Sequence, residues 1–382
     1  MLRQLAKTGI ACALQWSGAN KLIDVLNGSR NMPLVLGYHM VVDNIAAHEG
    51  TTIPASLISR RMLERQLDWI GRRFRFVSLD ELSPRLECGE PFDEPVAAIT
   101  FDDGYRDVYE HAFPLLQRKG IPSAVFVVTD LIGTSRLQVY DKLYLLLARA
   151  FSTWRSVSRE LARVLHTLGI SLPAHEMDGV NQMRHLARDP YTAMRVLFTA
   201  LPQAELCRVI EALEAEVEID ESALTELHAC SWDMLAEMRR AGVTIGSHSQ
   251  THALLPNEDW LTVLDETVGS RQVLESKLGI TINHFAYPNG SFNAAAVRAV
   301  AASGYRLAYT TCRHRDPTYP LLTIPRKFLG ENSCMDALGH FSPSIMSCQV
   351  NGVFDSAAGC EQNHGERGLA GRKLSWTSAL WA

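Results

Sequence analysis

The sequence predicts an α/β domain whose core is a largely parallel sheet, either closed into a barrel or doubly wound. Short apolar runs are followed by amphipathic helical patterns along most of the chain, and Gly residues mark the turns between them. Some of the runs, such as VAAITF at 96–101 and AVFVV at 124–128, are apolar at every position. Uninterrupted apolarity indicates strands that are covered on both faces, as in a parallel sheet flanked by helices. Seven or eight such strands fit either a closed barrel or a doubly wound sheet.

The predicted strands and helices alternate in chain order. The expected strands are Leu34–Tyr38, Phe74–Ser78, Val96–Phe101, Ser123–Thr129, Val243–Gly246, His284–Tyr287, Arg306–Thr310 and Leu322–Pro325. The expected helices are Met62–Arg72, Tyr109–Lys119, Trp232–Arg240, Asn257–Leu278 and Ala294–Ala302. A Gly follows the end of several of these helices, where its access to a left-handed backbone allows the helix to stop. Strand–helix–strand order of this kind is what parallel strands joined by crossover helices require.

Three segments depart from this alternation. Residues 135–228 carry consecutive amphipathic helical patterns, which predict a helical insertion whose simplest role is a packing cap. Residues 1–30 predict an amphipathic helix that packs on the domain or rests on a membrane surface, and they resemble a secretion signal less well. The main domain then spans 31–340. Residues 341–382 are rich in Gly, Ser and Asn and predict a loosely ordered tail.

Composition excludes several classes of protein. The chain has 382 residues, of which 47% are hydrophobic and 21% charged, so it can build a core and is not disordered throughout. The net charge of −5 includes no strongly basic domain, which argues against a nucleic-acid partner. Eight dispersed cysteines form no CxxC pair, which argues against a thiolate zinc knuckle. Their dispersal favours a cytoplasmic or membrane-peripheral location over a secreted one.

Two polar clusters directly follow predicted strands. Asp102 and Asp103 come after Val96–Phe101, where burial of charge is costly unless a cation or hydrogen-bond donors offset it. His248 and His252 follow another strand and stand four residues apart, so both imidazoles can face one point. Two imidazoles and one carboxylate form a three-ligand site for a divalent ion and leave positions open for water. Each cluster by itself is also compatible with a solvated turn or with surface histidines.

A third cluster, FAYPNG at 285–290, follows the strand His284–Tyr287. Pro288 fixes one backbone angle and Gly290 frees another, which predicts a rigid loop whose backbone N–H groups can stabilise an oxyanion. The carboxyl ends of parallel barrel strands meet at one mouth, and catalytic groups collect there. We therefore expect the three clusters to lie close together.

In this order, TFDDGY, HSQTH and FAYPNG resemble the motifs of the polysaccharide deacetylase family, the NodB homology domain of carbohydrate esterase family 4, in its branch with FAYPxG. The similarity extends from LGYHMVVD at 36–43 to LLTIPRKF at 321–328 and is interrupted by the insertion. The resemblance implies that residues 31–340 form a distorted (β/α) barrel. It also implies hydrolysis of an acetyl group on a sugar polymer.

The resemblance assigns roles by motif position. The implied ligands of one divalent metal ion are Asp103, His248 and His252. Zinc suits these donors best, and cobalt, nickel or iron also fit. Asp102 would be the general base that takes a proton from the metal-bound water, while the backbone N–H of Asn289 would help to hold the oxyanion.

Two positions depart from the family pattern. Ala286 stands where much of the family has an Arg that pairs with the base, and the stretch PLLTIPRKFLG lacks the His that serves as general acid. Arg326 follows the last predicted strand and could reach Asp102 instead. His39 follows the first strand and could protonate the leaving amine. The alternatives are a solvated Arg at a strand end and a His satisfied by local backbone.

The expected function is a metal-dependent hydrolase that removes N-acetyl groups from a GlcNAc-containing polysaccharide or glycan by attack of a metal-bound water. One alternative is an O-acetyl esterase acting on an acetylated polysaccharide. Others are a glycan-binding protein with weakened catalysis and a purely structural metal barrel. The paired carboxylates favour an enzyme, because a binding module does not need Asp102 beside a metal ligand. The expected partner is a polysaccharide or oligosaccharide, with peripheral membrane contact through the N-terminal helix as a further possibility.

Overall fold

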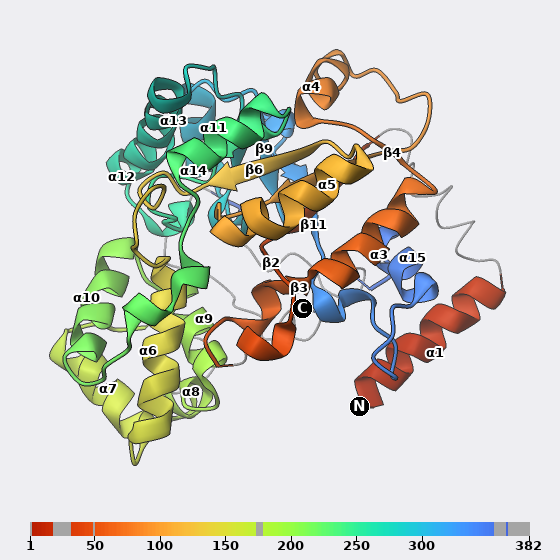
Figure 1. The fold of residues 1–382 in the computed structure, drawn as a ribbon. Helices are drawn as coiled ribbons and strands as arrows, with labels where there is room; N and C mark the ends of the chain where they lie inside the picture. The colour runs from red at the N-terminus through yellow and green to blue at the C-terminus, as the bar shows by residue number, and fades with distance from the viewer. Residues whose placement is uncertain (1, 18–31, 49, 173–178, 355–363, 366–382) are drawn as a thin grey trace.

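A computed structural model of the chain describes residues 2–17, 32–48, 50–172, 179–354 and 364–365. The strands of its main sheet are β1 (Leu34–Tyr38), β4 (Arg75–Phe76), β5 (Val96–Phe101), β6 (Ser123–Val127), β7 (Thr244–Ser247), β8 (His284–Ala286), β9 (Leu307–Thr310), β10 (Ile324–Pro325) and β11 (Lys327–Phe328). They pair in parallel in the order β10-β9-β8-β7-β6-β5-β1-β11, and β4 pairs with β5 (Figure 1). The sheet is nearly closed as a barrel, which confirms the predicted fold class and excludes the doubly wound alternative.

The two edge strands of this sheet are separated in sequence by Arg326 alone. The Arg326 backbone N–H donates to the Thr310 carbonyl of β9 at 2.7 Å. On the other side, the Leu329 N–H donates to the Gly37 carbonyl of β1 at 3.1 Å. One short stretch of chain therefore joins both edges of the barrel.

Side chains alternate between the barrel interior and the outer layer, as the period of a β-strand requires. Phe126 and Tyr309 belong to the interior cluster, with their ring centroids 5.4 Å apart. Their sequence neighbours Val125 and Ala308 belong instead to the cluster that includes the surrounding helices. This two-sided burial explains why the strands are apolar at consecutive positions.

Helices surround the barrel on the outside (Figure 1). They are α3 (Arg60–Gly71), α4 (Leu79–Cys88), α5 (Phe113–Lys119), α11 (Trp232–Arg240), α12 (Trp260–Leu264), α13 (Ser270–Leu278) and α14 (Ala294–Ala302). The sequence patterns missed α4, whose interior contains Pro84, and the short pair β2 (Met40–Val42) and β3 (Leu57–Ser59). A Ser78 side chain that accepts from the Glu81 N–H begins α4, and Leu79 and Leu82 are buried beneath it.

The helical insertion predicted over 135–228 is present. Its helices are α6 (Val139–Thr153), α7 (Val157–Thr167), α8 (Gly179–Leu186), α9 (Pro190–Ala200) and α10 (Gln203–Glu214). They gather beside the barrel (Figure 1) and share a hydrophobic core of their own. Met40 and Val42 of β2 belong to the same core, so the insertion packs against the segment that follows the first barrel strand.

The N-terminal helix α1 (Leu2–Trp16) lies beside α15 (Pro343–Val350). Helix α15 shows that the prediction of a loosely ordered tail from residue 341 is wrong for this part: a Ser342 cap begins the helix and Ile345 is fully buried. The sequence pattern did not show it because the helix spans only eight residues. Most of residues 355–382 lie outside the described part of the chain.

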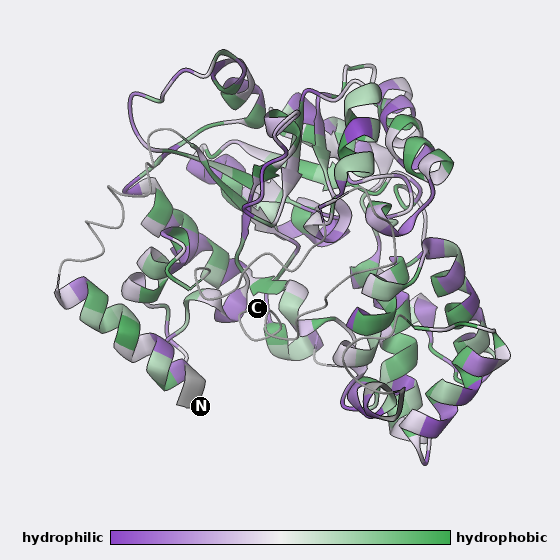
Figure 2. Cartoon of the chain, turned by 180° about the vertical axis from the view of Figure 1, so that it is seen from behind, coloured by the Kyte–Doolittle hydropathy of each residue, from purple (hydrophilic) through white to green (hydrophobic). Residues whose placement is uncertain are grey.

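Helix α1 docks through both apolar and polar side chains. Ala11 is fully buried in a small hydrophobic cluster with Ile345 of α15. Gln4 and Lys7 donate to backbone carbonyls of the barrel domain at 3.2 and 2.9 Å. Leu5, Ile10 and Trp16 are exposed, and Figure 2 shows hydrophobic positions along this helix. The helical pattern expected to continue to residue 30 lies outside the described residues. None of the helices that the structure describes is long and apolar enough to cross a bilayer.

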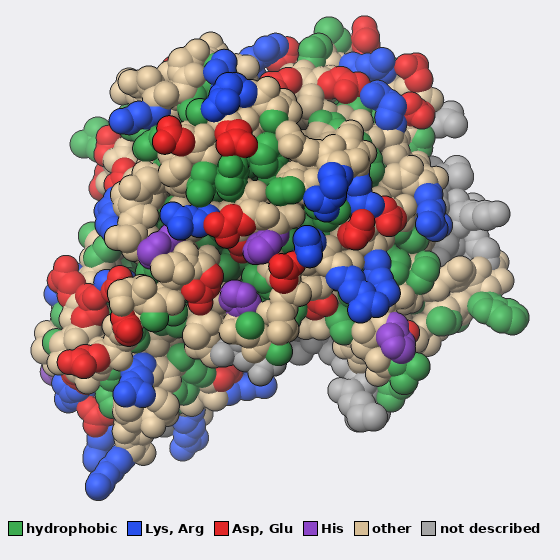
Figure 3. Space-filling model, in the orientation of Figure 1, with side chains coloured by type: hydrophobic (Ala, Val, Ile, Leu, Met, Phe, Trp, Pro, Cys, Tyr) green, Lys and Arg blue, Asp and Glu red, His purple; other side chains and the backbone are tan. Residues whose placement is uncertain are grey.

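Acidic and basic side chains are interspersed over the face of the molecule shown in Figure 3. This distribution agrees with the sequence, in which 42 acidic residues nearly balance 37 Lys and Arg.

Candidate metal centre and catalytic residues

The three sequence motifs meet at the carboxyl ends of β5, β7 and β8. Among the described residues, the only non-Gly residues with positive φ lie in these motifs: Asp103 (70°), Ser249 (69°), His252 (67°) and Asn289 (53°). L-residues rarely adopt this region, and each such residue costs on the order of 1–3 kcal/mol. Backbone strain is therefore concentrated where the chemistry is expected.

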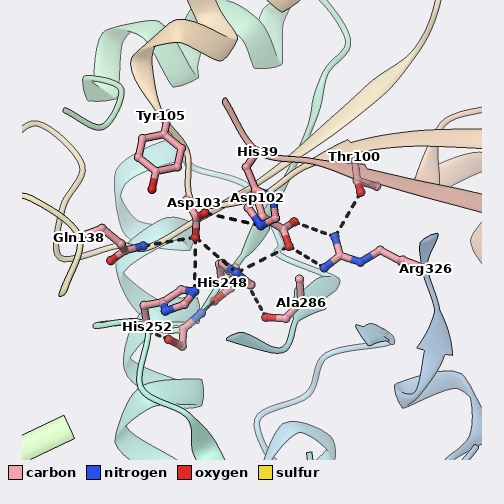
Figure 4. A network of polar contacts seen from close by, with 12 residues as sticks. His39, Thr100, Asp102, Asp103, Tyr105, Gln138, His248, His252, Ala286 and Arg326 are labelled. Atoms are coloured by element: carbon pink, nitrogen blue, oxygen red, sulfur yellow. Dashed lines mark hydrogen bonds and ion pairs between the residues drawn. The ribbon is translucent and has the colours of Figure 1, made fainter. Parts of the chain in front are cut away.

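The predicted ligands Asp103, His248 and His252 converge (Figure 4). The Nε2 atoms of His252 and His248 lie 3.4 and 3.6 Å from Asp103 Oδ1, and all three residues are buried. His248 Nδ1 lies 2.7 Å from the Ala286 carbonyl, so this nitrogen carries the proton and Nε2 presents its lone pair to the cluster. The donor types and their convergence fit a divalent ion.

Glu266 fixes the backbone of the loop that carries His248 and His252. Its carboxylate accepts the backbone N–H groups of Gln250 and Thr251, each at 2.9 Å, and it is itself 5% exposed. Within the loop, the Ser249 hydroxyl accepts the His252 N–H at 3.0 Å. These bonds maintain the strained backbone that aims the imidazole. Sequence reasoning missed Glu266, because a Glu in a helical pattern is usually solvated.

Arg326 forms a bidentate ion pair with Asp102. Its two terminal nitrogens each donate to a different Asp102 oxygen at 2.7 Å, and the Arg326 side chain is fully buried. The guanidinium also stacks between the rings of Phe126 and Phe328, at 5.1 and 4.9 Å. The alternative of a solvated Arg326 is therefore wrong. Burial favours the neutral form of Asp102, but the charge of Arg326 and its hydrogen bonds outweigh burial and lower the pKa of Asp102.

His39 and Asn289 are the more exposed of the predicted site residues. His39 Nε2 is 4.0 Å from Asp103 Oδ2, its side chain is 30% exposed, and its ring lies against Phe328 with centroids 4.8 Å apart. Burial of the ring lowers the pKa of His39, and the nearby carboxylates oppose this shift. Asn289 is exposed in the short turn Pro288–Gly290 that follows β8.

The insertion contributes side chains that sequence reasoning missed. The Tyr140 hydroxyl donates to Asp103 Oδ2 at 2.7 Å, and the Gln138 amide donates to Oδ1 at 3.3 Å. The Phe198 ring of α9 stacks on His252, with centroids 5.7 Å apart and an interplanar angle of 16°. The interpretation of the insertion as a mere packing cap is therefore wrong. No sequence signal distinguishes Tyr140 from the core aromatics of an amphipathic helix.

The chain is similar in sequence to known deacetylases. The profile of the polysaccharide deacetylase family matches residues 89–185 and 203–308, more than half of the chain, and the gap falls largely on α9. The poly-beta-1,6-N-acetyl-D-glucosamine N-deacetylase of Escherichia coli (strain K12) is 29% identical over 132 residues, covering 34% of this chain and 19% of that protein. The protein of the same name from Staphylococcus epidermidis is 29% identical over 125 residues, covering 31% and 43%. The chain thus aligns with less than half the length of these curated relatives.

A solved structure shows the same fold. A Streptococcus pyogenes deacetylase, crystallised in complex with acetate, superposes with a TM-score of 0.50 at 16% sequence identity. The match covers 84% of this chain and 97% of that one. At this identity the likeness concerns the barrel and the arrangement of its helices.

Proposed function

This chain belongs to the polysaccharide deacetylase family, and we propose that it is a metal-dependent hydrolase that removes N-acetyl groups from a GlcNAc-containing polysaccharide or glycan. The observation that carries the proposal is the convergence of Asp103, His248 and His252 beside a second carboxylate, Asp102, that is locked by Arg326. A structural or carbohydrate-binding metal site has no use for that second carboxylate. Hydrolysis does, because an attacking water must lose a proton.

The metal ligands and the base have separate tasks. A divalent ion held by the two imidazoles and Asp103, zinc being the best match to the donors, would polarise the acetyl carbonyl and make water more acidic. Asp102 is the acceptor for the proton of the attacking water. Its Oδ2 lies 3.7 Å from His248 Nε2, so the carboxylate adjoins the ligand cluster without belonging to it. The two Arg326 bonds keep Asp102 ionised and fixed in orientation, and each oxygen retains lone pairs for a proton.

The accessible residues complete the reaction. His39 is the proton donor to the leaving amine, since it faces the carboxylates and is also reached by solvent. The backbone N–H of Asn289 is the donor to the oxyanion, because the rigid turn Pro288–Gly290 holds it at the end of β8. With the ligands buried, the sugar approaches from the side of these two residues.

Acetate release from β-1,6-linked and β-1,4-linked N-acetylglucosamine oligomers tests this function directly. We expect zinc-dependent release that a chelator abolishes. In Asp102→Asn, kcat falls by about 10²- to 10⁴-fold while metal content is retained. Asp93→Asn, the same substitution at an exposed carboxylate, serves as the control and keeps full activity.

Four outcomes contradict all or part of the proposal. Release that persists after the metal is removed excludes the metal-dependent reaction. Faster release from O-acetylated xylan than from the amide substrates indicates an O-acetyl esterase. Oligomer binding without any release indicates a glycan-binding protein. Loss of metal from Asp102→Asn would make Asp102 a ligand rather than the base.

A further inference from the structure

A row of buried side-chain oxygens connects the insertion to Asp103, one of the candidate metal ligands. Asp141 Oδ2 lies 2.6 Å from the Tyr105 hydroxyl, which lies 2.7 Å from the Tyr140 hydroxyl. Tyr140 in turn donates to Asp103 Oδ2 at 2.7 Å. All four residues are less than 10% exposed. Figure 4 shows Tyr105 and Gln138 beside Asp103. The row ends on the proposed metal ligand.

Counting hydrogens shows that the row needs one more proton than two tyrosines supply. Three contacts at hydrogen-bond distance require three hydrogens, and each tyrosine contributes one. Both tyrosines keep their hydrogens at neutral pH, because a phenol ordinarily loses its proton only near about pH 10. If Asp103 and Asp141 were both ionised, Tyr105 would donate its hydrogen to Asp141 and Tyr140 would donate its hydrogen to Asp103. Their oxygens would then face each other at 2.7 Å with no hydrogen between them. One of the carboxyl groups therefore carries the third proton.

The surroundings decide which carboxyl group it is. Asp103 receives the Gln138 amide, which favours a charged carboxylate, and a cation held between it and the two imidazoles would favour that charge further. Asp141 is 2% exposed, and within the described residues its recorded hydrogen bond is to Tyr105 and it forms no recorded ion pair. Its place in the first turn of α6 favours charge by only about 0.3–1 kcal/mol. An unpaired buried carboxylate costs several times more. Burial accordingly raises the pKa of Asp141 to about 8.

We infer that Asp141 is a neutral carboxylic acid at the head of a one-way hydrogen-bond chain, running through Tyr105 and Tyr140, that holds Asp103 in position. Tyr140 and Asp141 are thus positioning residues for the metal site. The inference rests on the proposed function only in treating Asp103 as a metal ligand. In this hydrogen-bond chain, Oδ2 of Asp103 accepts from Tyr140, and Oδ1 faces the two imidazoles. It also avoids adding a third negative charge next to Asp102 and Asp103.

The first test measures the zinc affinity of the full chain by competition with a chromophoric chelator. Outer partners of metal ligands typically contribute 10- to 100-fold to affinity, so Tyr140→Phe should weaken zinc binding by that factor. Tyr144→Phe removes the same atom one turn further along α6, outside the row, and should keep the parent affinity. Unchanged affinity in Tyr140→Phe, or equal loss in both variants, overturns the positioning role of Tyr140.

The second test addresses the proton on Asp141. Asn is neutral and can donate an N–H to Tyr105, so Asp141→Asn should retain the zinc affinity, whereas Asp141→Leu, which cannot donate, should lose it. The infrared difference spectrum of the parent minus Asp141→Asn at neutral pH should show the band of a protonated, buried carboxyl group. Absence of that band, or equal loss of affinity in the Asn and Leu variants, overturns the assignment.

Neither readout depends on acetyl hydrolysis. If the protein passes both tests but releases no acetate, the inference stands and the proposed function is wrong. If the chain binds no zinc, the metal-site role of Tyr140 fails. The infrared comparison then still decides the protonation of Asp141 and does not require the Leu variant to fold.

Discussion

Asp102 and Asp103 are adjacent in the chain but have opposite surroundings. The charge of Arg326 and its hydrogen bonds outweigh burial and lower the pKa of Asp102, whereas burial raises the pKa of Asp103 to about 6. Two titratable groups whose surroundings separate their pKa values are suited to different tasks. The pair therefore provides an ionised base and a carboxylate that a cation must compensate.

Replacing Arg326 tests the origin of this difference. In Arg326→Gln the guanidinium charge is lost, so the pKa of Asp102 rises and its proton is retained to higher pH. The acid side of the pH profile of kcat/KM should therefore move to higher pH, with a lower plateau. Arg240→Gln, at an exposed position, should leave the profile unchanged. A profile that keeps its acid side in Arg326→Gln would separate Arg326 from the ionisation of the base.

His39 is tested by the choice of leaving group. An amine leaves only after protonation, whereas a phenolate leaves without it. His39→Ala should therefore reduce release from N-acetyl substrates severely and hydrolysis of activated aryl acetates much less, with metal affinity nearly unchanged. Equal loss on both substrates would make His39 a structural residue, and the acid would then be another group at the mouth.

At the scale of elements, the motifs could be predicted because their chemistry is local in sequence. TFDDGY and HSQTH each follow one strand and need only the barrel to bring them together. Tyr140 could not be predicted, because its contact with Asp103 depends on how α6 packs against the barrel. Helix α15 was missed for a related reason: its stability comes from contact with α1 rather than from its own eight residues.

The support that Glu266 gives the histidine loop can be measured. Glu266→Ala leaves two backbone N–H groups without their acceptor, at a cost of about 1–3 kcal/mol in unfolding free energy. Zinc affinity should fall as well, because His252 is held by the same loop. Glu218→Ala at an exposed position of the insertion is the control. Full stability in Glu266→Ala would show that the loop is held by its own hydroxyl contacts.

For the whole molecule, buried acids set how stability depends on pH. Burial raises the pKa of Asp103 and Asp141, to about 6 and about 8, and that of Asp107 well above its ordinary value. Groups with a raised folded-state pKa contribute stability that is lost as pH rises towards that pKa. The titratable neighbours of Asp141 are Tyr105, Tyr140, Asp103 and Asp107. The contribution of these acids to the stability of the metal-free fold should therefore decrease across this range.

Urea unfolding of the metal-free protein between about pH 4 and pH 8 checks this trend. As pH rises, the free energy of unfolding of the parent should decrease relative to that of Asp141→Asn, which lacks the titrating carboxyl group. Added zinc should offset the decrease, because the ion stabilises the ionised form of Asp103. A slope that is the same in the parent and in Asp141→Asn would mean that Asp141 is already ionised at low pH.

The closure of the barrel has a consequence for its catalytic state. Arg326 is the single residue between the two edge strands, and it is also the counter-ion of Asp102. Any thermal opening of this seam that displaces the Arg326 backbone also removes the guanidinium from the base. The chain therefore need not unfold to lose its activity: a local fraying event at one junction is enough to switch off proton transfer while the rest of the barrel stays intact.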